Sequence, residues 1–156
     1  VFSGDVIEHL NYQGGIAMLK EAYRVLKPGG FLLIHTAPNT VFTKFTYFFI
    51  EPILRIVANY IVAIIRDHFL MMKKLHVYEY NIFSLRRAAK DAGLKNAKVW
   101  LGSDLIRSGQ HRFTAKLKNN FFVKIIVFLS RFNLVKFFFS NDLYLKCCKE
   151  EEGIKK

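Results

Sequence analysis

Cysteine is nearly absent from this sequence, which contains only the adjacent pair Cys147 and Cys148. Neighbouring residues of a strand point to opposite faces, and no second pair is present. The sequence therefore excludes a disulfide framework and a four-cysteine metal site, and we interpret both residues as reduced cysteines of a cytoplasmic protein. A G-x-G turn between a strand and a helix is also missing. No apolar run reaches about eighteen uncharged residues, which argues against a transmembrane span.

Acidic residues are half as numerous as basic ones, since 12 Asp and Glu stand against 24 Lys and Arg, and the net charge is +12. Such a balance favours an anionic partner, which can be nucleic acid, an acidic membrane surface or an acidic substrate. A compositional bias toward Lys, Phe, Ile and Asn, as AT-rich genes produce, is the alternative explanation. With 156 residues, 52% of them hydrophobic, the chain can form one domain with a sizeable core.

The first forty residues are typical of two parallel strands joined by a helix. Residues 1–4 indicate the end of a buried strand, and residues 31–35 a second apolar strand. An amphipathic helix between them is predicted by apolar residues at helical spacing: Ile16, Leu19, Tyr23 and Leu26. Ligands bind such sheets at the carboxyl ends of the strands, so a ligand is expected near Asp5 and residues 36–39.

Two apolar segments interrupt this pattern. Residues 41–74 predict an inserted pair of helices, of which the second begins at Pro52 because proline suits a first helical turn. Residues 119–139 predict a further apolar helix. Both segments mix Phe, Ile and Leu with basic residues, as helices that lie at a membrane interface do.

The rest of the chain completes an α/β domain over residues 1–149, followed by a polar tail at residues 150–156. Asn81 or Ser84 is expected to cap a helix, and Gly93 to end it. The last two strands are predicted over residues 97–102 and 142–149.

Several of these segments, in the same order, resemble the class I S-adenosylmethionine-dependent methyltransferases, most of all the subgroup that acts on small molecules and lipids. The matching stretches are D-V-I-E-H-L from Asp5, R-V-L-K-P-G-G-F-L-L-I from Arg24, A-P-N from Ala37, H-V-Y-E-Y from His76, L-R-R from Leu85 and A-G-L from Ala92. The resemblance implies a partial Rossmann-like methyltransferase sheet, strands four to seven, with the last strand antiparallel. It also implies that the chain is a C-terminal fragment without the glycine-rich cofactor turn, inactive alone.

The resemblance assigns roles to residues at the strand ends. Ser3, Gly4 and Asp5 are expected to lie beside the cofactor, S-adenosylmethionine, although Asp5 could simply cap the following turn. The rim of the acceptor pocket is expected to contain Thr36, Pro38, Asn39 and His76.

Glu8 and His9 leave three interpretations open. His9 is a possible catalytic base, because histidine titrates near neutral pH. Alternatively, Asp5, Glu8 and His9 share a divalent metal, since metal-dependent members of the resembled family carry E-x-x-E-H at this place. A further ligand is then needed, and His35, His68 and His76 are the candidates. In the third interpretation Glu8 and His9 only hold the loop through hydrogen bonds.

The predicted activity is methyl transfer to a small-molecule or lipid-like acceptor. The apolar segments and the positive charge also suggest peripheral contact with the inner face of an anionic membrane. The alternative is a non-catalytic, membrane-associated module related to methyltransferases. Nucleic acid is a weaker prediction, because the aromatic residues cluster in apolar runs and are not spaced along a polar groove.

Overall fold

The computed structural model describes residues 1–57, 59–102, 121, 124–125, 128 and 132–150. Its four strands form one sheet in the order β1-β2-β4-β3. The elements in chain order are β1 (Phe2–Gly4), a 3₁₀ helix (Ile7–His9), α1 (Tyr12–Arg24), β2 (Phe31–Thr36), a π-helix (Val41–Thr46), α2 (Tyr47–Val57), α3 (Asn59–Leu75), α4 (Ile82–Asp91), β3 (Lys98–Leu101), α7 (Asn133–Phe139) and β4 (Leu143–Cys148).

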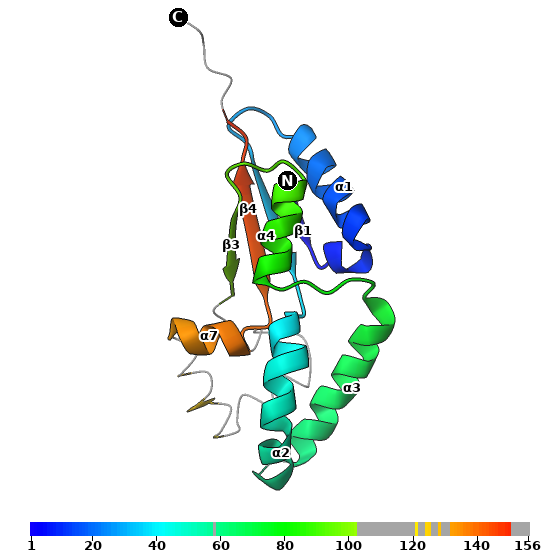
Figure 1. Cartoon of the computed structure of the whole chain (residues 1–156), viewed down its shortest axis with the longest axis vertical. Helices are drawn as coiled ribbons and strands as arrows, with labels where there is room; N and C mark the ends of the chain where they lie inside the picture. Colours follow the sequence, from blue (N-terminus) through cyan, green and yellow to red (C-terminus); the bar gives the residue numbers. More distant parts are fainter. Residues whose placement is uncertain (58, 103–120, 122–123, 126–127, 129–131, 151–156) are drawn as a thin grey trace, which may run out of the picture.

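The sheet is mixed, and its strand directions confirm an α/β fold with an antiparallel last strand. β1 pairs with β2 in parallel, with Gly4 opposite His35. β4 lies between β2 and β3 and is antiparallel to both. Consequently the carboxyl ends of β1, β2 and β3 lie at the same end of the sheet, together with the start of β4 (Figure 1).

The predicted helical crossover between β1 and β2 is confirmed. α1 begins at Asn11, whose side chain accepts a hydrogen bond from the Gly14 amide. The turn after the helix places Gly29 at a φ of 74°, a backbone conformation that favours glycine. Lys149, at the end of β4, donates hydrogen bonds to the carbonyls of Arg24 and Leu26, so it binds the last turn of this helix.

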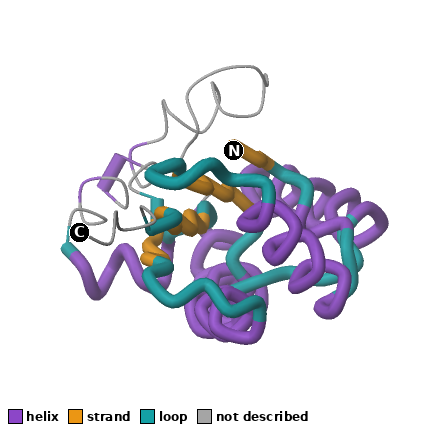
Figure 2. Tube along the Cα trace, turned by 90° about the horizontal axis from the view of Figure 1, so that it is seen from above, coloured by secondary structure: helices purple, strands orange, loops and turns teal. Residues whose placement is uncertain are grey.

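The main core lies between one face of the sheet and two helices, α1 and α4. α4 begins with the capping box of Asn81 and Ser84, and Gly93 follows its end at a φ of 78°. The apolar face of α4, with Leu85 and Ala88, is buried together with alternate residues of the strands, among them Leu32, Ile34 and Leu145. Figure 2 shows the helices gathered mainly on one side of the strands.

Two details of the apolar segments differ from the predictions. The second helix begins at Asn59, and Pro52 lies inside α2. The packing of Tyr47 and Leu54, both buried, outweighs the backbone hydrogen bond that Pro52 removes, and the ion pair between Glu51 and Arg55 spans the proline. Of the helix predicted over residues 119–139, the last part is α7, and most of the rest lies outside the described residues.

The helices α2, α3 and α7 lie at the end of the sheet where β1, β2 and β3 finish (Figure 1). α2 packs against α3, and α7 packs against the π-helix. Among the helices that the structure describes, none combines the length and apolar character required to span a bilayer.

Candidate functional site

Asp5 and His35 connect the ends of β1 and β2. Asp5 follows β1 with a φ of 55°, in the left-handed region that non-glycine residues rarely occupy. Its amide donates to the His35 carbonyl at 3.1 Å, and its carboxylate Oδ1 lies 2.8 Å from His35 Nδ1. The side chain of Asp5 is 47% exposed whereas that of His35 is 2% exposed, so the histidine holds a carboxylate that solvent or a ligand can reach.

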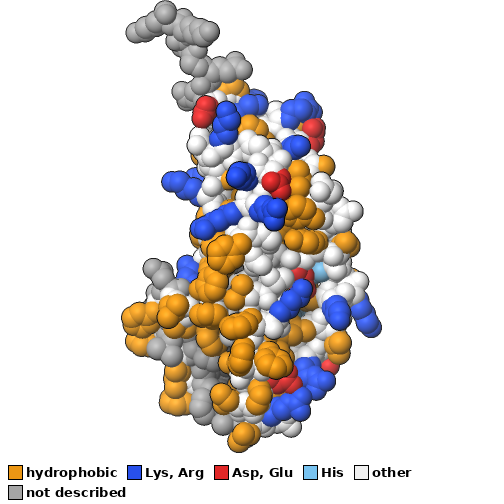
Figure 3. Space-filling model, in the orientation of Figure 1, with side chains coloured by type: hydrophobic (Ala, Val, Ile, Leu, Met, Phe, Trp, Pro, Cys, Tyr) orange, Lys and Arg blue, Asp and Glu red, His pale blue; other side chains and the backbone are white. Residues whose placement is uncertain are grey.

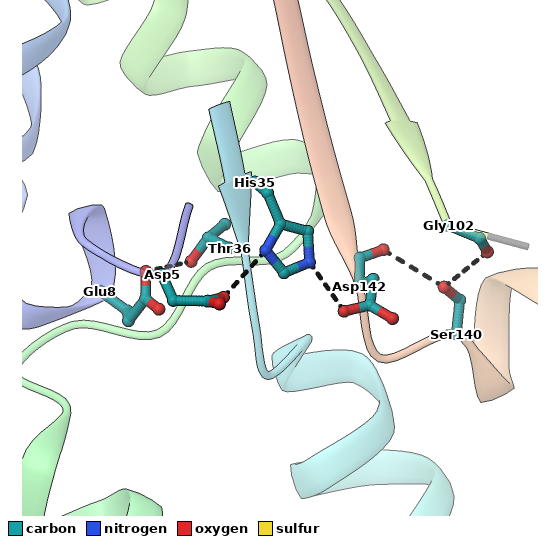
Figure 4. A network of polar contacts seen from close by, with 7 residues as sticks. All are labelled: Asp5, Glu8, His35, Thr36, Gly102, Ser140 and Asp142. Carbon is teal, nitrogen blue, oxygen red and sulfur yellow. Dashed lines mark hydrogen bonds and ion pairs between the residues drawn. The ribbon is translucent and has the colours of Figure 1, made fainter. Parts of the chain in front are cut away.

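His35 also contacts β4. Its Nε2 lies 2.8 Å from Oδ1 of Asp142, so the ring bridges two carboxylates (Figure 4). A neutral imidazole has one N–H, and only the protonated ring can donate to both oxygens at once. Ser140 extends this network, because its hydroxyl donates to the Gly102 carbonyl at the end of β3. The four strands are therefore joined at this end by polar contacts.

Glu8 contacts the end of β2 through Thr36, the residue that follows His35 (Figure 4). Thr36 Oγ1 donates a hydrogen bond of 2.7 Å to Glu8 Oε2, and both residues are 1% exposed. The Glu8 carbonyl accepts hydrogen bonds from the amides of Val77 and Tyr78. Glu8 thus connects the end of β2 to the segment that contains His76.

The structure brings Glu8, His9 and His76 together. One carboxylate oxygen and one nitrogen from each ring lie within 4.8 Å of one another. His9 Nδ1 lies 2.9 Å from the Leu75 carbonyl, which can only accept, so Nδ1 carries the proton and the neutral ring keeps its Nε2 lone pair. Two imidazoles and a carboxylate are ligands that divalent transition metals bind. His76 is one of the candidate further ligands, whereas Asp5 faces His35 and is not part of this cluster.

A cavity of about 690 Å³ adjoins this cluster, because His76 forms part of its wall. Its walls come from four places: the segment after β2, the π-helix, α3, and residues 76–84. Pockets of roughly 300–1,000 Å³ are usual for small ligands, so a small molecule fits here. The cavity therefore places an acceptor-sized space beside the ends of the strands.

The predicted acceptor residues divide into two groups. Pro38 and His76 line the cavity. Thr36 and Asn39 are buried and bonded within the protein: Thr36 to Glu8, and Asn39 to the Ser140 carbonyl and the Val41 amide.

The predicted cofactor residues lie together at the end of β1. Ser3 and Gly4 are half-buried within the strand, and Asp5 follows them. The described residues therefore give each predicted site residue a defined place, and their roles remain predictions.

The sequence offered His35 only as a candidate further metal ligand, and it predicted no site role for Asp142, Tyr80, Lys44 or Lys73. His35 and Asp142 belong to the network at the strand ends, and a histidine inside the apolar stretch F-L-L-I-H-T was the available signal, because a buried imidazole needs polar partners. Tyr80 is fully buried, and burial raises its pKa to about 12. Lys44 and Lys73 line the cavity from separate helices, and no local pattern indicates that they converge.

Comparison with known proteins places the chain in no family: no protein-family model and no curated protein matches it. Among solved structures, it is similar to phosphoethanolamine N-methyltransferase 2 of Haemonchus contortus in complex with phosphomonomethylethanolamine and S-adenosylhomocysteine, at 17% identity and a TM-score of 0.48. A structure of that enzyme in complex with S-adenosyl-L-methionine has a sequence identity of 18% and a TM-score of 0.49. A SAM-dependent methyltransferase from Archaeoglobus fulgidus has a sequence identity of 14% and a TM-score of 0.49.

These alignments cover 96–97% of this chain. The chain spans only 33% of the length of the Haemonchus enzyme and 58% of the Archaeoglobus protein. With TM-scores below 0.5, these likenesses carry no functional conclusion, and the function proposed below rests on the residues of this chain.

Proposed function

We propose that the chain forms part of an enzyme that transfers a methyl group from S-adenosylmethionine to a small-molecule or lipid-like acceptor. One observation carries the proposal: the ends of β1 and β2 lie side by side, with the exposed carboxylate of Asp5 at one end and an acceptor-sized cavity beside the other. The order of the matching sequence segments supports the same activity.

The cofactor role belongs to residues 3–5. Gly4 has no side chain, which permits a ligand to approach the backbone closely at the strand end, and a Cβ there would lie 3.3 Å from the ring of Phe2. The left-handed backbone of Asp5 turns the chain there, and the contact with His35 fixes its carboxylate, which attracts the positive sulfonium or amino group of a donor. When bound, S-adenosylmethionine supplies an electrophilic methyl carbon on a sulfonium sulfur.

His9 is the proposed base for an acceptor that must lose a proton. The donor would supply the methyl group to the acceptor's nucleophilic atom, and its sulfur would keep the electron pair of the broken carbon–sulfur bond. The acceptor's proton passes to His9 Nε2, because the Leu75 carbonyl holds Nδ1 as the protonated nitrogen. The cavity walls position the acceptor, and this positioning is the main contribution expected of the protein.

Binding and transfer measurements on the complete natural polypeptide that carries these residues test the proposal. We expect calorimetry to detect S-adenosylmethionine binding, and Asp5→Asn to weaken it by about tenfold, the equivalent of roughly 1.4 kcal/mol. His9→Gln should slow transfer of a labelled methyl group and leave cofactor affinity unchanged. Asp91→Asn, at the far end of α4, is the matched carboxylate control. Absence of cofactor binding in the unsubstituted polypeptide contradicts the proposal.

A divalent metal is the alternative role for the same cluster, and the residues fit one. Glu8, His9 and His76 would hold the ion, and Nδ1 of His76 is a buried nitrogen without a hydrogen-bond partner among the described residues. A bound ion would polarise an acceptor hydroxyl. The two roles exclude each other, because coordination uses the lone pair that a base needs. Calorimetric titration of the unsubstituted protein and of the His76→Ala variant with Zn²⁺ or Mn²⁺ distinguishes the two roles. Metal binding that the substitution removes supports the metal site, and absence of metal binding supports His9 as the base.

A non-catalytic, membrane-associated module remains the second candidate, favoured by exposed apolar side chains. Figure 3 displays hydrophobic residues over the half of the molecule that contains α2 and α7. On α2 and α7 the most exposed described residues are Phe48, Ile53, Ile56 and Leu134, at 71%, 61%, 88% and 73%. Flotation with neutral and anionic vesicles tests this candidate. It predicts that Phe48→Ser with Ile56→Ser reduces recovery on anionic vesicles, whereas Val25→Ser does not. Equal absence from both vesicle types removes the candidate.

A further inference from the structure

We propose that the cavity beside His76 binds a phosphate-type dianion, and that the acceptor carries this group. The inference rests on the proposed function in treating the anion as part of the methyl acceptor. It rests independently on the charge and the hydrogen-bonding groups of the cavity walls.

The first support is an excess of positive charge around the cavity. Lys44 of the π-helix and Lys73 of α3 both line it, and neither has a carboxylate within ion-pair distance in the part of the chain that the structure describes. Among the described lining residues, Glu79 is the acidic one, and its Oε1 lies 3.8 Å from His76 Nδ1. Two lysines without a neighbouring carboxylate give this wall a positive potential, which attracts an anion.

The second support is a wall of fixed polar groups at the start of α4. Asn81 accepts hydrogen bonds from the amides of Phe83 and Ser84. Its Nδ2 donates to Thr40 Oγ1, which fixes the orientation of both side chains. The positive end of the α4 dipole lies at this wall, and it favours negative charge. Thr40 and Asn81 both line the cavity, and each keeps one donor for an anion: the Thr40 hydroxyl, which accepts from Asn81, has its own hydrogen, and the Asn81 amide has a second N–H.

Two buried polar atoms of lining residues have no hydrogen-bond partner among the described residues. Thr43 Oγ1 and His76 Nδ1 are buried and make no hydrogen bond within the described residues. An unsatisfied buried polar atom costs about 1–3 kcal/mol, and it is therefore uncommon without a reason. A ligand with several acceptor oxygens provides partners after small side-chain movements.

The chemistry of the walls selects among anions. Two point charges match a dianion such as a phosphate monoester better than a carboxylate with a single charge, and lysine binds phosphate as a point charge. The lining also contains apolar residues, Pro38, Phe69 and Met72. We therefore expect a phosphate group attached to an apolar or partly apolar body, either as a soluble metabolite or as a lipid headgroup.

Calorimetric titration of the chain with phenyl phosphate tests the inference directly and needs no methyl donor. We expect saturable binding, and the affinity should fall at least tenfold in the double variant that carries Lys44→Gln and Lys73→Gln. The control Lys20→Gln with Lys90→Gln removes the same charge from exposed positions on α1 and α4 and should change the affinity less than twofold. Phenol, which lacks the phosphate, should bind at least tenfold more weakly than phenyl phosphate.

Vesicles that contain phosphatidate distinguish the two sources of the phosphate. Lysine-dependent binding to these vesicles that phenyl phosphate displaces identifies a lipid headgroup, whereas binding of the soluble ester alone identifies a metabolite. The inference is overturned if phenyl phosphate does not bind, if the cavity variant binds as well as the control variant, or if phenol binds equally well. Lysine-dependent phosphate binding without any methyl transfer retains this site and refutes the proposed function instead.

Discussion

Replacing Gly15 by alanine should destabilise the protein mainly because of Tyr80, while Ile7 Cγ1, 3.3 Å from the added Cβ, is a second and milder contact. A Cβ added at Gly15 would overlap Tyr80 Oη, and both residues are buried where α1 meets the segment that forms a wall of the cavity. Alanine in place of a helical glycine usually stabilises by about 0.4–1 kcal/mol, whereas overpacking costs about 1–3 kcal/mol. We expect a net loss of about 1–2 kcal/mol, or roughly 3–8 °C in Tm for a domain of this size.

Shortening Tyr80 to phenylalanine should restore the stability of the Gly15→Ala variant. The next Tyr80 atom, Cζ, lies 3.5 Å from the added Cβ, an ordinary van der Waals contact. Tyr80 Oη has no hydrogen-bond partner among the described residues, so its removal alone should cost little. The unsubstituted protein, the two single variants and the double variant form a double-mutant cycle. Urea unfolding followed by circular dichroism measures the stability of all four, and we expect a coupling energy of about 1–2 kcal/mol between the two substitutions.

Two controls make the cycle specific. Gly14→Ala adds the same methyl group to the same helix but contacts Asn11 and Leu10, so it should change stability by less than about 0.5 kcal/mol. Tyr47→Phe removes another buried hydroxyl without a described partner and should not rescue Gly15→Ala. Additive effects of Gly15→Ala and Tyr80→Phe would refute the reasoning, and so would a Gly15→Ala variant as stable as the unsubstituted protein.

Four further outcomes follow from the structure. His35→Gln should lower the free energy of unfolding by about 3 kcal/mol, because it leaves the carboxylates of Asp5 and Asp142 without their bridge; an unchanged urea midpoint contradicts this. Thr36→Val should cost about 1–3 kcal/mol in the same assay by removing the hydrogen bond to the buried Glu8, while Thr→Val at an exposed position should not. Asn81→Ala should lower the free energy of unfolding by about 1 kcal/mol through loss of the α4 cap, and Asn81→Asp should keep most of the stability that the cap provides. Because burial raises the pKa of Tyr80 to about 12 from 10.0, stability should fall as the pH rises from 10 to 12, and Tyr80→Phe should lose less across that window; identical losses in both proteins oppose this assignment.

The arrangement of β1, α1 and β2 was predictable because each local signal agrees with its neighbours. Helical spacing of apolar residues, the turn at Gly29 and an apolar strand all favour the same parallel unit, and the structure confirms it. The Asn81 cap was predictable for the same reason, since an amide side chain at that position satisfies the free amides of the first turn.

The start of α3 was not predictable from local signals. Pro52 is a strong indicator of a first helical turn, yet the helix that begins at Tyr47 continues through it. Tertiary packing of the apolar face decides the boundary, and packing is a property of segments that are distant in sequence. β2 shows the same limit: its sequence favours burial on both faces, but Phe31 is 50% exposed among the described residues.

The candidate site was predictable only where its residues are close in sequence. Asp5, Glu8 and His9 share a short segment, but the structure separates Asp5 from the other two and replaces it with His76, 67 positions further on from His9. The bridge from His35 to Asp142 spans 107 positions. Such contacts depend on strand order, and no spacing rule within one sequence predicts that order.

Binding of S-adenosylmethionine at the ends of β1 and β2 is the most direct test of the proposed activity. The measurement is a calorimetric titration of the complete natural polypeptide that carries residues 1–156, repeated with Gly4→Val and with the distant control Asp91→Asn. We predict saturable binding that Gly4→Val weakens at least tenfold and the control leaves unchanged. No binding by the unsubstituted polypeptide, or equal affinity in all three proteins, would contradict a donor site at these strand ends.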